Sequence, residues 1–308
     1  MIKAGVIGLG AMGKHHARIY SQLPDVELAG VADVDAELAS SIARRHDSKS
    51  FTDYHELLRQ GLDVVSIAVP TSLHRDVVLA TAEAGINVLV EKPIADTLNS
   101  ASQMIEQCDR NEIKLMVGHV ERFNPVVPVI KERIKTEEVM LINFTRVGPM
   151  PARIKDVGVI IDLATHDIDL ARYIIGSRFK DVHSLRSLDP YDKGGREDNA
   201  LLSFEMENGT LVQIVANWLT PFKVRELSIA TRERYIKSWL RDQKVLEYEA
   251  WKDDSYLVRE LPVTFAEPLT LEIETFLKAV RENLDVPVSG EEGLETLAIA
   301  LECVKGTS

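Results

Sequence analysis

The sequence predicts an α/β protein of two domains, the first a doubly wound parallel sheet and the second an α/β domain built on an antiparallel sheet. Over the first 118 residues, short apolar runs alternate with amphipathic stretches of helical period, the pattern of a parallel sheet covered by helices on both faces. After Gly118 this alternation stops and consecutive strand-like runs follow, as in an antiparallel sheet. The chain of 308 residues is also longer than a single hydrophobic core usually supports.

The expected strands of the first domain are continuous apolar runs, which is typical of strands buried on both faces. They are Ile2–Ile7, Glu27–Ala32, Val64–Ala68, Asn87–Val90 and Lys114–Val117. Helices fit between them at Met12–Gln22, Ala36–His46, Tyr54–Arg59, Ser72–Ala84 and Leu98–Asn111. Right-handed crossovers between such strands give a doubly wound sheet.

The second part begins with a helix that starts at Asn124-Pro125, followed by a strand at Val139–Val147 and one long helix over residues 158–175. The strongest turn signal in the chain is the Asn-Gly pair of Glu207-Asn208-Gly209-Thr210, between two β-rich runs. The remaining expected elements are strands at Asp181–Leu188, Ala200–Glu207, Thr210–Asn217, Val224–Thr231, Arg234–Leu240 and Val245–Glu249, then helices at Leu269–Glu282 and Glu291–Val304. We therefore expect domains at residues 1–120 and 121–308, with the last helix able to return to the first domain.

Composition excludes several classes of partner. A net charge of −12 argues against nucleic acid or an anionic membrane, because both attract basic surfaces. Cys108 and Cys303 lie far apart in expected helices, so we expect neither a disulfide framework nor a zinc site. No apolar run approaches the roughly 20 residues that span a bilayer, and the early run Ala4–Leu9 leads into a glycine loop rather than a signal-peptide cleavage site. These features favour a cytoplasmic protein.

A glycine-rich loop, Gly8-Leu9-Gly10-Ala11-Met12-Gly13, joins the first expected strand to the first helix. The first glycine permits a tight turn, the second lets the backbone approach a pyrophosphate, and the third allows the helix to pack closely on the sheet. The start of the helix then supplies amide donors and a partial positive charge. We therefore expect Gly8, Gly10, Ala11, Met12 and Gly13 to bind a dinucleotide.

Asp33 ends the second expected strand, twenty residues after Gly13. An acid at this place binds the hydroxyl groups of the adenosine ribose and repels a 2′-phosphate, so the sequence favours NAD over NADP. The alternative is a turn or helix-capping role, although Asp35 could serve as the cap instead.

Glu91-Lys92-Pro93 follows the expected strand Asn87–Val90, at the edge of the sheet where open α/β sheets bind their ligands. We expect Glu91 to contact the cofactor. Lys92 could transfer a proton if burial or neighbouring cations lower its pKa. The alternative is a surface lysine beside a loop proline.

The long helix at 158–175 carries Asp162, His166 and Asp169 at positions i, i+4 and i+7, which places them on one face. Almost every other position is apolar, so the helix is expected to be buried. His166 is then a natural proton-transfer group, and Asp162 could orient it or bind a hydroxyl. The alternative is a solvated edge with an Asp–His pair. No second histidine or cysteine completes a convincing ligand set nearby, so we expect no metal.

Four further residues have weaker signals. Arg122 could hold a phosphate or a sugar hydroxyl, and Asn124 could bind substrate, but Asn followed by Pro125 is also an ordinary helix start. Thr71, which follows Pro70, could contact the cofactor or only cap a helix. His74 is expected near the cofactor but could be a packing residue.

Together these motifs resemble the glucose-fructose oxidoreductase/inositol dehydrogenase/rhizopine catabolism (Gfo/Idh/MocA) family over essentially the whole chain. The markers are the glycine loop, Pro70-Thr71-Ser72-Leu73-His74, Glu91-Lys92-Pro93 and the Asp162/His166/Asp169 helix. The resemblance implies a Rossmann domain and a carboxy-terminal α/β domain with a large, open, mainly antiparallel sheet that often forms a homo-oligomer interface, in a dimer or tetramer. It also implies catalytic roles for Lys92, Asp162 and His166, and a cis Lys92–Pro93 peptide. Many members have Asn where Thr71 stands, which puts its cofactor contact in doubt.

Within the family, Glu121–Pro125 and Lys155–Leu163 look most like the nucleotide-sugar branch, which oxidises the 3-hydroxyl of UDP-N-acetylglucosamine or its uronic acid. Arg153 and Lys155, before the catalytic helix, could meet the diphosphate or belong to a solvated loop. The expected reaction is hydride transfer from a sugar carbon to NAD⁺, with Lys92 or His166 taking the hydroxyl proton. The alternatives are an inositol, polyol or free-sugar dehydrogenase, or a non-catalytic NAD-binding redox sensor.

Overall fold

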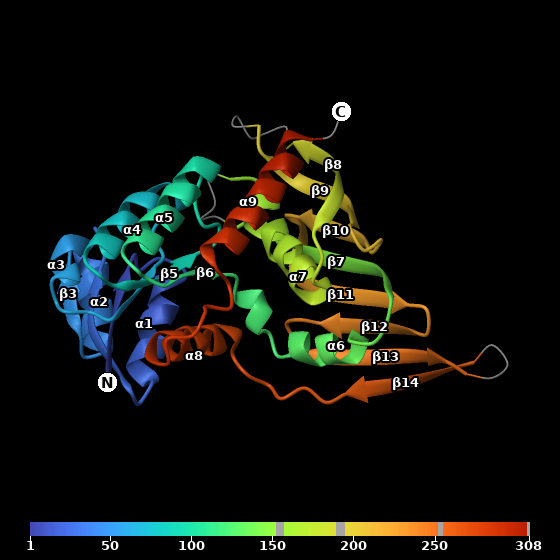
Figure 1. Ribbon diagram of the computed structural model, residues 1–308, viewed down its shortest axis with the longest axis horizontal. Coiled ribbons are helices and arrows are strands. Elements are labelled where there is room, and N and C mark those ends of the chain that lie inside the picture. The colour runs from blue at the N-terminus through green and yellow to red at the C-terminus, as the bar shows by residue number, and fades with distance from the viewer. Residues whose placement is uncertain (152–156, 189–194, 252–254, 307–308) are drawn as a thin grey trace. The chain divides into compact units, whose positions relative to one another are not determined.

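The computed structural model describes residues 1–151, 157–188, 195–251 and 255–306, and most of its elements are labelled in Figure 1. Two compact units make up the chain. The amino-terminal unit contains Met1–Val120 and Leu269–Leu297, and the carboxy-terminal unit contains Glu121–Pro268 and the residues from Ala298 onward. The division near the carboxyl end falls within the last helix, α9 (Gly290–Lys305).

The amino-terminal unit has a six-stranded parallel sheet in the order β3-β2-β1-β4-β5-β6. This is the order of a doubly wound dinucleotide-binding fold, so the predicted fold class is confirmed. The strands are β1 (Ile2–Ile7), β2 (Val26–Ala32), β3 (Lys49–Phe51), β4 (Val64–Ile67), β5 (Asn87–Glu91) and β6 (Leu115–Gly118). The strand β3 was not predicted from the sequence.

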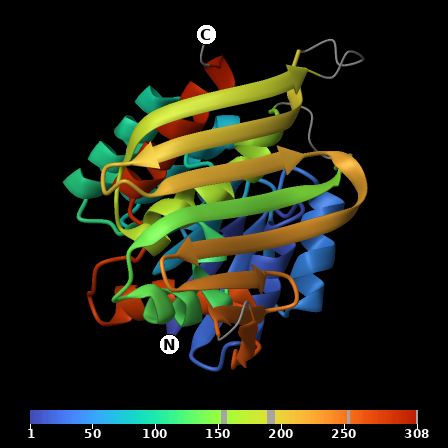
Figure 2. The same ribbon diagram turned by 90° about the vertical axis from the view of Figure 1, so that its right-hand side faces the viewer.

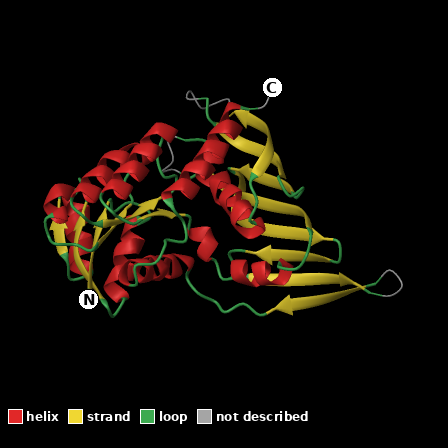
Figure 3. Ribbon diagram, in the orientation of Figure 1, coloured by secondary structure: helices red, strands yellow, loops and turns green. Residues whose placement is uncertain are grey.

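Helices and strands alternate along this unit, as Figure 3 shows by colour. The helices are α1 (Gly13–Gln22), α2 (Ala36–Arg45), α3 (Tyr54–Leu58), the 3-10 turn η1 (Thr71–Leu73), α4 (His74–Glu83), α5 (Leu98–Arg110) and α8 (Pro268–Arg281). Side-chain oxygens of Asp35, Asp53 and Thr97 accept backbone N–H groups at the starts of α2, α3 and α5, where such caps stabilise a helix. Cys108 on α5 and Cys303 on α9 are both free and buried.

The carboxy-terminal unit has an eight-stranded mixed sheet in the order β14-β13-β12-β11-β7-β10-β9-β8. Among the described strands, β7 and β10 form the parallel pair, and the other neighbours are antiparallel. The hairpin predicted at Glu207–Thr210 joins β9 to β10, with Gly209 at φ +85°. The strands are β7 (Val139–Pro149), β8 (Phe179–Leu188), β9 (Glu197–Met206), β10 (Leu211–Asn217), β11 (Leu219–Thr231), β12 (Arg234–Trp239), β13 (Lys244–Ala250) and β14 (Tyr256–Leu261). The edge strand β14 was not predicted from the sequence.

One face of this sheet carries helices and the other is open, as Figure 2 shows with the sheet turned toward the viewer. Two elements precede β7 in the chain: the 3-10 turn η2 (Val120–Phe123) and helix α6 (Val126–Ile134). The segment that leads into α7 (Thr165–Ile175) follows β7. Strand residues alternate between buried and exposed, for example buried Leu202 beside exposed Leu201 on β9. The exposed side chains of the open face include Leu185, Leu201, Leu211, Tyr235 and Val258.

The expected long helix at 158–175 is not a continuous α-helix. Residues Ile160–Ala164 form a π-helical turn, η3, and α7 begins at Thr165, whose backbone N–H donates to the Ile160 carbonyl five residues back. A π turn holds one more residue per hydrogen bond than an α turn and often marks functional sites. The predicted long helix is present over residues 159–175, but its π turn was not predicted, because hydrophobic periodicity does not reveal a single extra residue.

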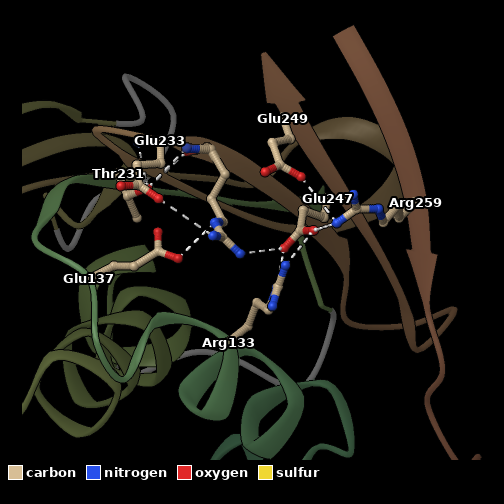
Figure 4. Close-up of polar contacts among 8 residues, drawn as sticks. Arg133, Glu137, Thr231, Glu233, Glu247, Glu249 and Arg259 are labelled. Carbon is tan, nitrogen blue, oxygen red and sulfur yellow. Dashed lines mark hydrogen bonds and ion pairs between the residues drawn. The ribbon is translucent and has the colours of Figure 1, made fainter. Parts of the chain in front are cut away.

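A network of ion pairs ties α6 to β13, the neighbour of the edge strand β14 (Figure 4). The carboxylate of Glu247 on β13 is almost fully buried and accepts hydrogen bonds from Arg133, Arg234 and Arg259. The hydrogen bond from Arg133, together with the neighbouring arginine charges, holds the pKa of Glu247 below its usual range despite its burial. Arg234 also pairs with Glu137 at 2.7 Å.

In the described part of the chain, no helix is long and apolar enough to cross a membrane.

Candidate active site

The glycine loop between β1 and α1 has the close approaches that the motif predicts. A Cβ atom on Gly13 would lie 1.7 Å from the carbonyl oxygen of Gly8. Gly8 has φ +85°, and its own Cβ would lie 2.7 Å from the backbone of Ala68. Gly10, by contrast, is exposed and has no atom within 4 Å of a Cβ position. Gly8 and Gly13 thus shape the turn, and Gly10 leaves open space beside it.

The start of α1 is suited to an anion. Within the described residues, no side chain caps this helix and its first turn holds no acid. The amide groups at a helix start carry a partial positive charge and need acceptors, which a pyrophosphate supplies. The open space at Gly10 and these uncapped amides fit the phosphates of NAD, with Gly8, Gly10, Ala11, Met12 and Gly13 as the predicted contacts.

Asp33 follows β2 and faces the glycine loop. Its Oδ2 accepts the backbone N–H of Leu9 at 2.7 Å, and its Oδ1 accepts the N–H of Asp35 at 3.0 Å. Asp35, rather than Asp33, caps α2 by accepting the N–H groups of Glu37 and Leu38. Of the alternative given for Asp33, the helix-capping role was therefore wrong, whereas the turn role is observed in its hydrogen bond from the Asp35 N–H. The predicted contact of Asp33 with the ribose stays a prediction.

Lys92 follows β5 directly and is half-buried, and the Lys92–Pro93 peptide is cis, as the family resemblance implied. The ring of His74 lies beneath this turn, with Nδ1 3.1 Å from the carbonyl oxygens of Pro93 and Ile94 and Nε2 3.1 Å from that of Val69. Burial lowers the pKa of His74, although the carbonyl oxygens and the charge of Glu91 oppose this shift. His74 thus joins the loops after β4 and β5.

Pro70 and Thr71 lie in the loop after β4, at the start of the 3-10 turn η1. Pro70 is exposed and Thr71 half-buried. The cap position of this turn is occupied by Pro70 and that of α4 by Leu73, so Thr71 does not hold the helix-cap position that the alternative gave it. Contacts of Pro70, Thr71 and His74 with the cofactor stay predictions.

In the carboxy-terminal unit, Asp162 lies in the π turn with 7% of its surface exposed, and His166 lies half-buried in the first turn of α7. The π turn is held by Glu197 on β9, whose Oε1 accepts the backbone N–H of Ile160 at 3.1 Å. The carboxylate of Glu197 occupies the place of a Cβ on Gly158, which would lie 2.1 Å from Oε1. Gly158 is therefore the residue that lets Glu197 reach the start of this helix.

Asp169, which was expected on the same helix face as Asp162 and His166, is engaged in a buried ion pair. It forms a buried, bidentate ion pair with Arg122, with both N–O distances at 2.7 Å. The guanidinium of Arg122 also lies over the ring of Tyr173, 4.8 Å from its centroid. Arg122 thus has a structural role that the sequence did not reveal, and its contact with substrate stays a prediction.

Asn124 is buried at the start of α6. Its Nδ2 donates to the Leu240 carbonyl at 3.0 Å and to Glu121 at 3.3 Å, and its Oδ1 accepts the N–H of Val126 at 3.3 Å. The alternative role of Asn124 at the start of a helix is thus observed. A contact between Asn124 and substrate stays a prediction.

A second buried ion cluster lies beside the π turn and was missed from the sequence. Arg146 on β7 binds both oxygens of Asp167 on α7 at 2.7–2.9 Å and Glu121 at 2.7 Å. Arg225 lies opposite Arg146 on the neighbouring strand β11 and donates to the carbonyls of Val147 and Val224. Burial and the charge of Arg146 lower the pKa of Arg225 to about 10. The negative charges of Asp167, Glu121 and Asp162 oppose this shift.

This cluster fixes α7 to the middle of the sheet. Burial raises the pKa of Asp167 although Arg146 opposes the shift, whereas Arg146 overcomes burial and lowers the pKa of Glu121. No local motif indicates such a cluster, because its members are distant in sequence.

Arg153 and Lys155, predicted to meet a diphosphate, lie outside the described residues. Among the residues that are described, no group of three or more His, Cys, Asp or Glu side chains could hold a metal ion.

Two family models match this chain. The model described as the oxidoreductase family with an NAD-binding Rossmann fold matches residues 2–119, and that of the GFO/IDH/MocA carboxy-terminal domain matches residues 140–236. The first match covers the glycine loop, Asp33 and the Lys92 turn, and the second covers the π turn and α7. NAD is thus the cofactor of this protein family.

Named dehydrogenases are similar to this chain over nearly its full length. UDP-N-acetylglucosamine 3-dehydrogenase from Acidithiobacillus ferrooxidans is 29% identical, with 98% of this chain and 96% of that protein aligned. Its solved structure superposes with a TM-score of 0.91 over 99% of this chain and 97% of that one, at 28% identity. The NAD⁺-dependent scyllo-inositol 2-dehydrogenase from Bacillus subtilis is 28% identical, with 95% of this chain and 92% of that protein aligned.

Proposed function

We propose that this chain, which belongs to the GFO/IDH/MocA family of oxidoreductases, oxidises C3 of a UDP-N-acetylhexosamine, either UDP-N-acetylglucosamine or its uronic acid. The observation that carries the dehydrogenase assignment is the Lys92 turn at the carboxyl end of β5, in the same parallel sheet as the NAD-binding loop. Ligands of open α/β sheets bind at this edge. The choice of sugar rests on the similarity to UDP-N-acetylglucosamine 3-dehydrogenase.

The reaction removes a hydride from the carbinol carbon and a proton from its hydroxyl group, leaving a ketone. Bound NAD⁺ supplies the acceptor for the hydride. Lys92 or His166 accepts the proton, and either side chain must be neutral beforehand to do so. Asp162 binds or orients the reacting hydroxyl, and Arg122, Asn124, Arg153 and Lys155 are proposed as further substrate contacts.

An NAD⁺-reduction assay with a panel of sugars tests the substrate class. We expect turnover with UDP-N-acetylglucosamine or its uronic acid, and none with inositol or glucose. Turnover with inositol alone would instead favour the second candidate, an inositol dehydrogenase, which the similarity to scyllo-inositol 2-dehydrogenase supports. Tight NAD binding without turnover on any sugar or polyol would favour a redox sensor.

Variants test the chemistry of the proton acceptor. Lys92→Ala and His166→Ala should bind NADH like the wild type while losing turnover by about two orders of magnitude or more, the usual contribution of general acid–base catalysis. Leu98→Ala, an exposed position on α5, is the control and should turn over normally. If both variants match the wild type in kcat, neither side chain is the proton acceptor.

The open face of the large sheet supports a proposed homo-oligomer, a dimer or tetramer. Cross-strand neighbours on this face include the exposed pair Leu185 and Leu201 and the tyrosines Tyr235 and Tyr248, whose ring centroids lie 6.0 Å apart. Exposed apolar side chains gathered on one face often mark an interface. Light scattering should give a mass of two or four chains, and a monomer would contradict this proposal.

A further inference from the structure

Behind the Lys92 turn, four polar side chains of the amino-terminal unit form an unbroken line of hydrogen bonds. The hydroxyl of Tyr20 lies 2.9 Å from that of Ser66, which lies 2.9 Å from Nδ1 of His16. Nε2 of His16 lies 3.0 Å from Oε1 of Glu91, the residue that precedes Lys92. We call Tyr20, Ser66, His16 and Glu91 the relay. It joins α1, β4 and the end of β5.

The relay is buried along almost its whole length. Tyr20 and Ser66 are fully buried, His16 is 1% exposed, and the Glu91 side chain is 13% exposed. Burying polar groups costs free energy unless each finds a partner, whereas a complete network holds its members in one arrangement. The line of hydrogen bonds therefore fixes the Glu91 carboxylate from behind.

The hydrogens in the relay can be assigned from its chemistry. An ionised Glu91 carboxylate can only accept, so Nε2 of His16 carries a hydrogen. In a neutral ring Nδ1 then accepts, and the Ser66 hydroxyl donates to it. Because that donation uses the single Ser66 hydrogen, the Ser66 oxygen accepts from Tyr20. Every donor points the same way, from Tyr20 toward Glu91.

The charges around Glu91 agree with this assignment. Burial by itself raises the pKa of Glu91, but the hydrogen bond from His16 and the nearby positive charge of Lys92 hold the pKa below its usual value. At the other end, burial raises the pKa of Tyr20, partly opposed by Ser66 and aided by Glu272 on α8, so this hydroxyl remains a donor.

The surroundings leave the Glu91 carboxylate little freedom. Gly118 on β6 pairs with Glu91, and a Cβ there would lie 3.5 Å from Oε2 and 3.3 Å from the Glu91 Cα. His16 lies three residues after Gly13, in the first turn of the helix that the NAD loop begins. A single side chain thus connects the cofactor loop to the residue next to Lys92.

We propose that Tyr20, Ser66 and His16 are positioning residues, which act through Glu91 to hold the Lys92–Pro93 turn in place relative to the NAD loop during turnover. The inference rests on the proposed dehydrogenase function. A misplacement of about 1 Å at a reacting group can cost about a hundredfold in rate. The relay is therefore expected to affect kcat more than the binding of NAD.

Variants of His16 test the donor to Glu91. His16→Leu removes both ring nitrogens and should lower kcat about tenfold or more, with the KM for NAD⁺ changed less than about threefold. His16→Gln restores an amide N–H near the place of Nε2 and should recover most of the lost kcat. If kcat of His16→Leu stays within twofold of the wild type, the proposal is wrong.

Milder variants keep the test decisive if His16→Leu does not fold. Ser66→Ala breaks the relay, whereas Ser100→Ala removes another buried serine hydroxyl of the same unit that is hydrogen-bonded to Thr97. Tyr20→Phe is compared with Tyr54→Phe in the same way. We expect kcat to fall in Ser66→Ala and Tyr20→Phe but not in the two controls. Equal kcat values in each matched pair would overturn the proposal.

A measurement that needs no substrate separates this inference from the proposed function. NMR of isotope-labelled histidine should show the neutral Nε2–H tautomer for His16 at pH 8, and Ser66→Ala should alter its ring signals. An Nδ1–H tautomer would refute the assigned direction of the relay. A wild-type protein with the expected tautomer but no turnover on any sugar or polyol would refute the proposed function and the positioning role, while leaving the hydrogen-bond assignment intact.

Discussion

Gly158 lies against the carboxylate of Glu197, so a single added methyl group tests how firmly the π turn that carries Asp162 is held. In Gly158→Ala the new Cβ would lie 2.1 Å from Oε1 and 2.2 Å from both Cδ and Oε2 of Glu197. Ordinary contacts begin near 3.4 Å, so the carboxylate must move by more than an ångström. Its 3.1 Å hydrogen bond from the Ile160 N–H cannot survive that movement.

The expected cost follows from the lost hydrogen bond. A hydrogen bond to a charged group contributes about 1.5–3 kcal/mol, and Glu197 is 3% exposed, so water does not easily replace it. For a unit of this size each kcal/mol lowers Tm by about 2–4 °C. Thermal unfolding followed by circular dichroism should therefore show a decrease in Tm of about 3–12 °C. Turnover should fall as well, because Asp162 loses its anchored turn.

The controls separate this clash from a general effect of alanine. Gly148→Ala changes a buried glycine of the same unit, but the tight contact of its Cβ, at 3.2 Å, would be with the movable side chain of Lys223, and the Lys223 Cα at 3.7 Å is an ordinary contact, so Tm should change little. In a double-mutant cycle with Glu197→Ala, removal of the carboxylate should also remove the cost of the added methyl. Additive losses in that cycle, or an unchanged Tm in Gly158→Ala, would refute the reasoning.

Three further predictions concern the NAD loop and the buried charges. Gly13→Ala places a Cβ 1.7 Å from the Gly8 carbonyl oxygen and should abolish NADH binding measured by calorimetry; a Kd within twofold of the wild type would contradict the loop assignment. Arg122→Leu removes the ion pair of the buried Asp169 carboxylate and should cost about 3–5 kcal/mol in denaturant unfolding. Arg122→Leu/Asp169→Leu should cost less, and a larger loss in the double variant would show that the pair is not the cause. The pKa of Glu247 is held low in the folded protein, so its ion pairs stabilise the fold above the usual glutamate pKa and lose that contribution as the pH falls through the lowered value. Glu247→Gln should therefore lower Tm at pH 7 and reduce the dependence of Tm on pH between 3 and 7, and an unchanged pH dependence would argue against this contribution.

The sequence predicts the strands that are buried and misses two that lie at sheet edges. Strand β1 is a continuous apolar run and was found at its observed bounds, Ile2–Ile7. Strand β3 has only three residues, Lys49–Phe51, and its first two are exposed. Strand β14, Tyr256–Leu261, has no buried residue. Hydrophobic patterning reports burial, so short or exposed edge strands carry little of this signal.

The candidate site divides in the same way between local and distant information. The glycine loop, the Asp33 carboxylate and the Lys92 turn are short segments whose conformation depends on neighbouring residues, and the sequence pattern identifies them directly. The ion pair of Arg122 with Asp169 joins positions 47 residues apart. Which carboxylate pairs with which arginine depends on strand register and helix position, and a single sequence does not contain that information in a readable form.

The two units support their candidate reactive residues by similar means. In the amino-terminal unit, the relay holds Glu91 beside Lys92, and in the carboxy-terminal unit Arg146 and Asp167 hold α7 beside the π turn of Asp162. Each support consists of buried polar groups with defined partners, which cost free energy to bury and therefore need a compensating benefit. Reactive groups must be held within a fraction of an ångström by groups that are themselves fixed. Substitutions in either support should therefore lower kcat more than they raise KM. The sequence signals for these supports are weak because their residues position other groups and form no local motif.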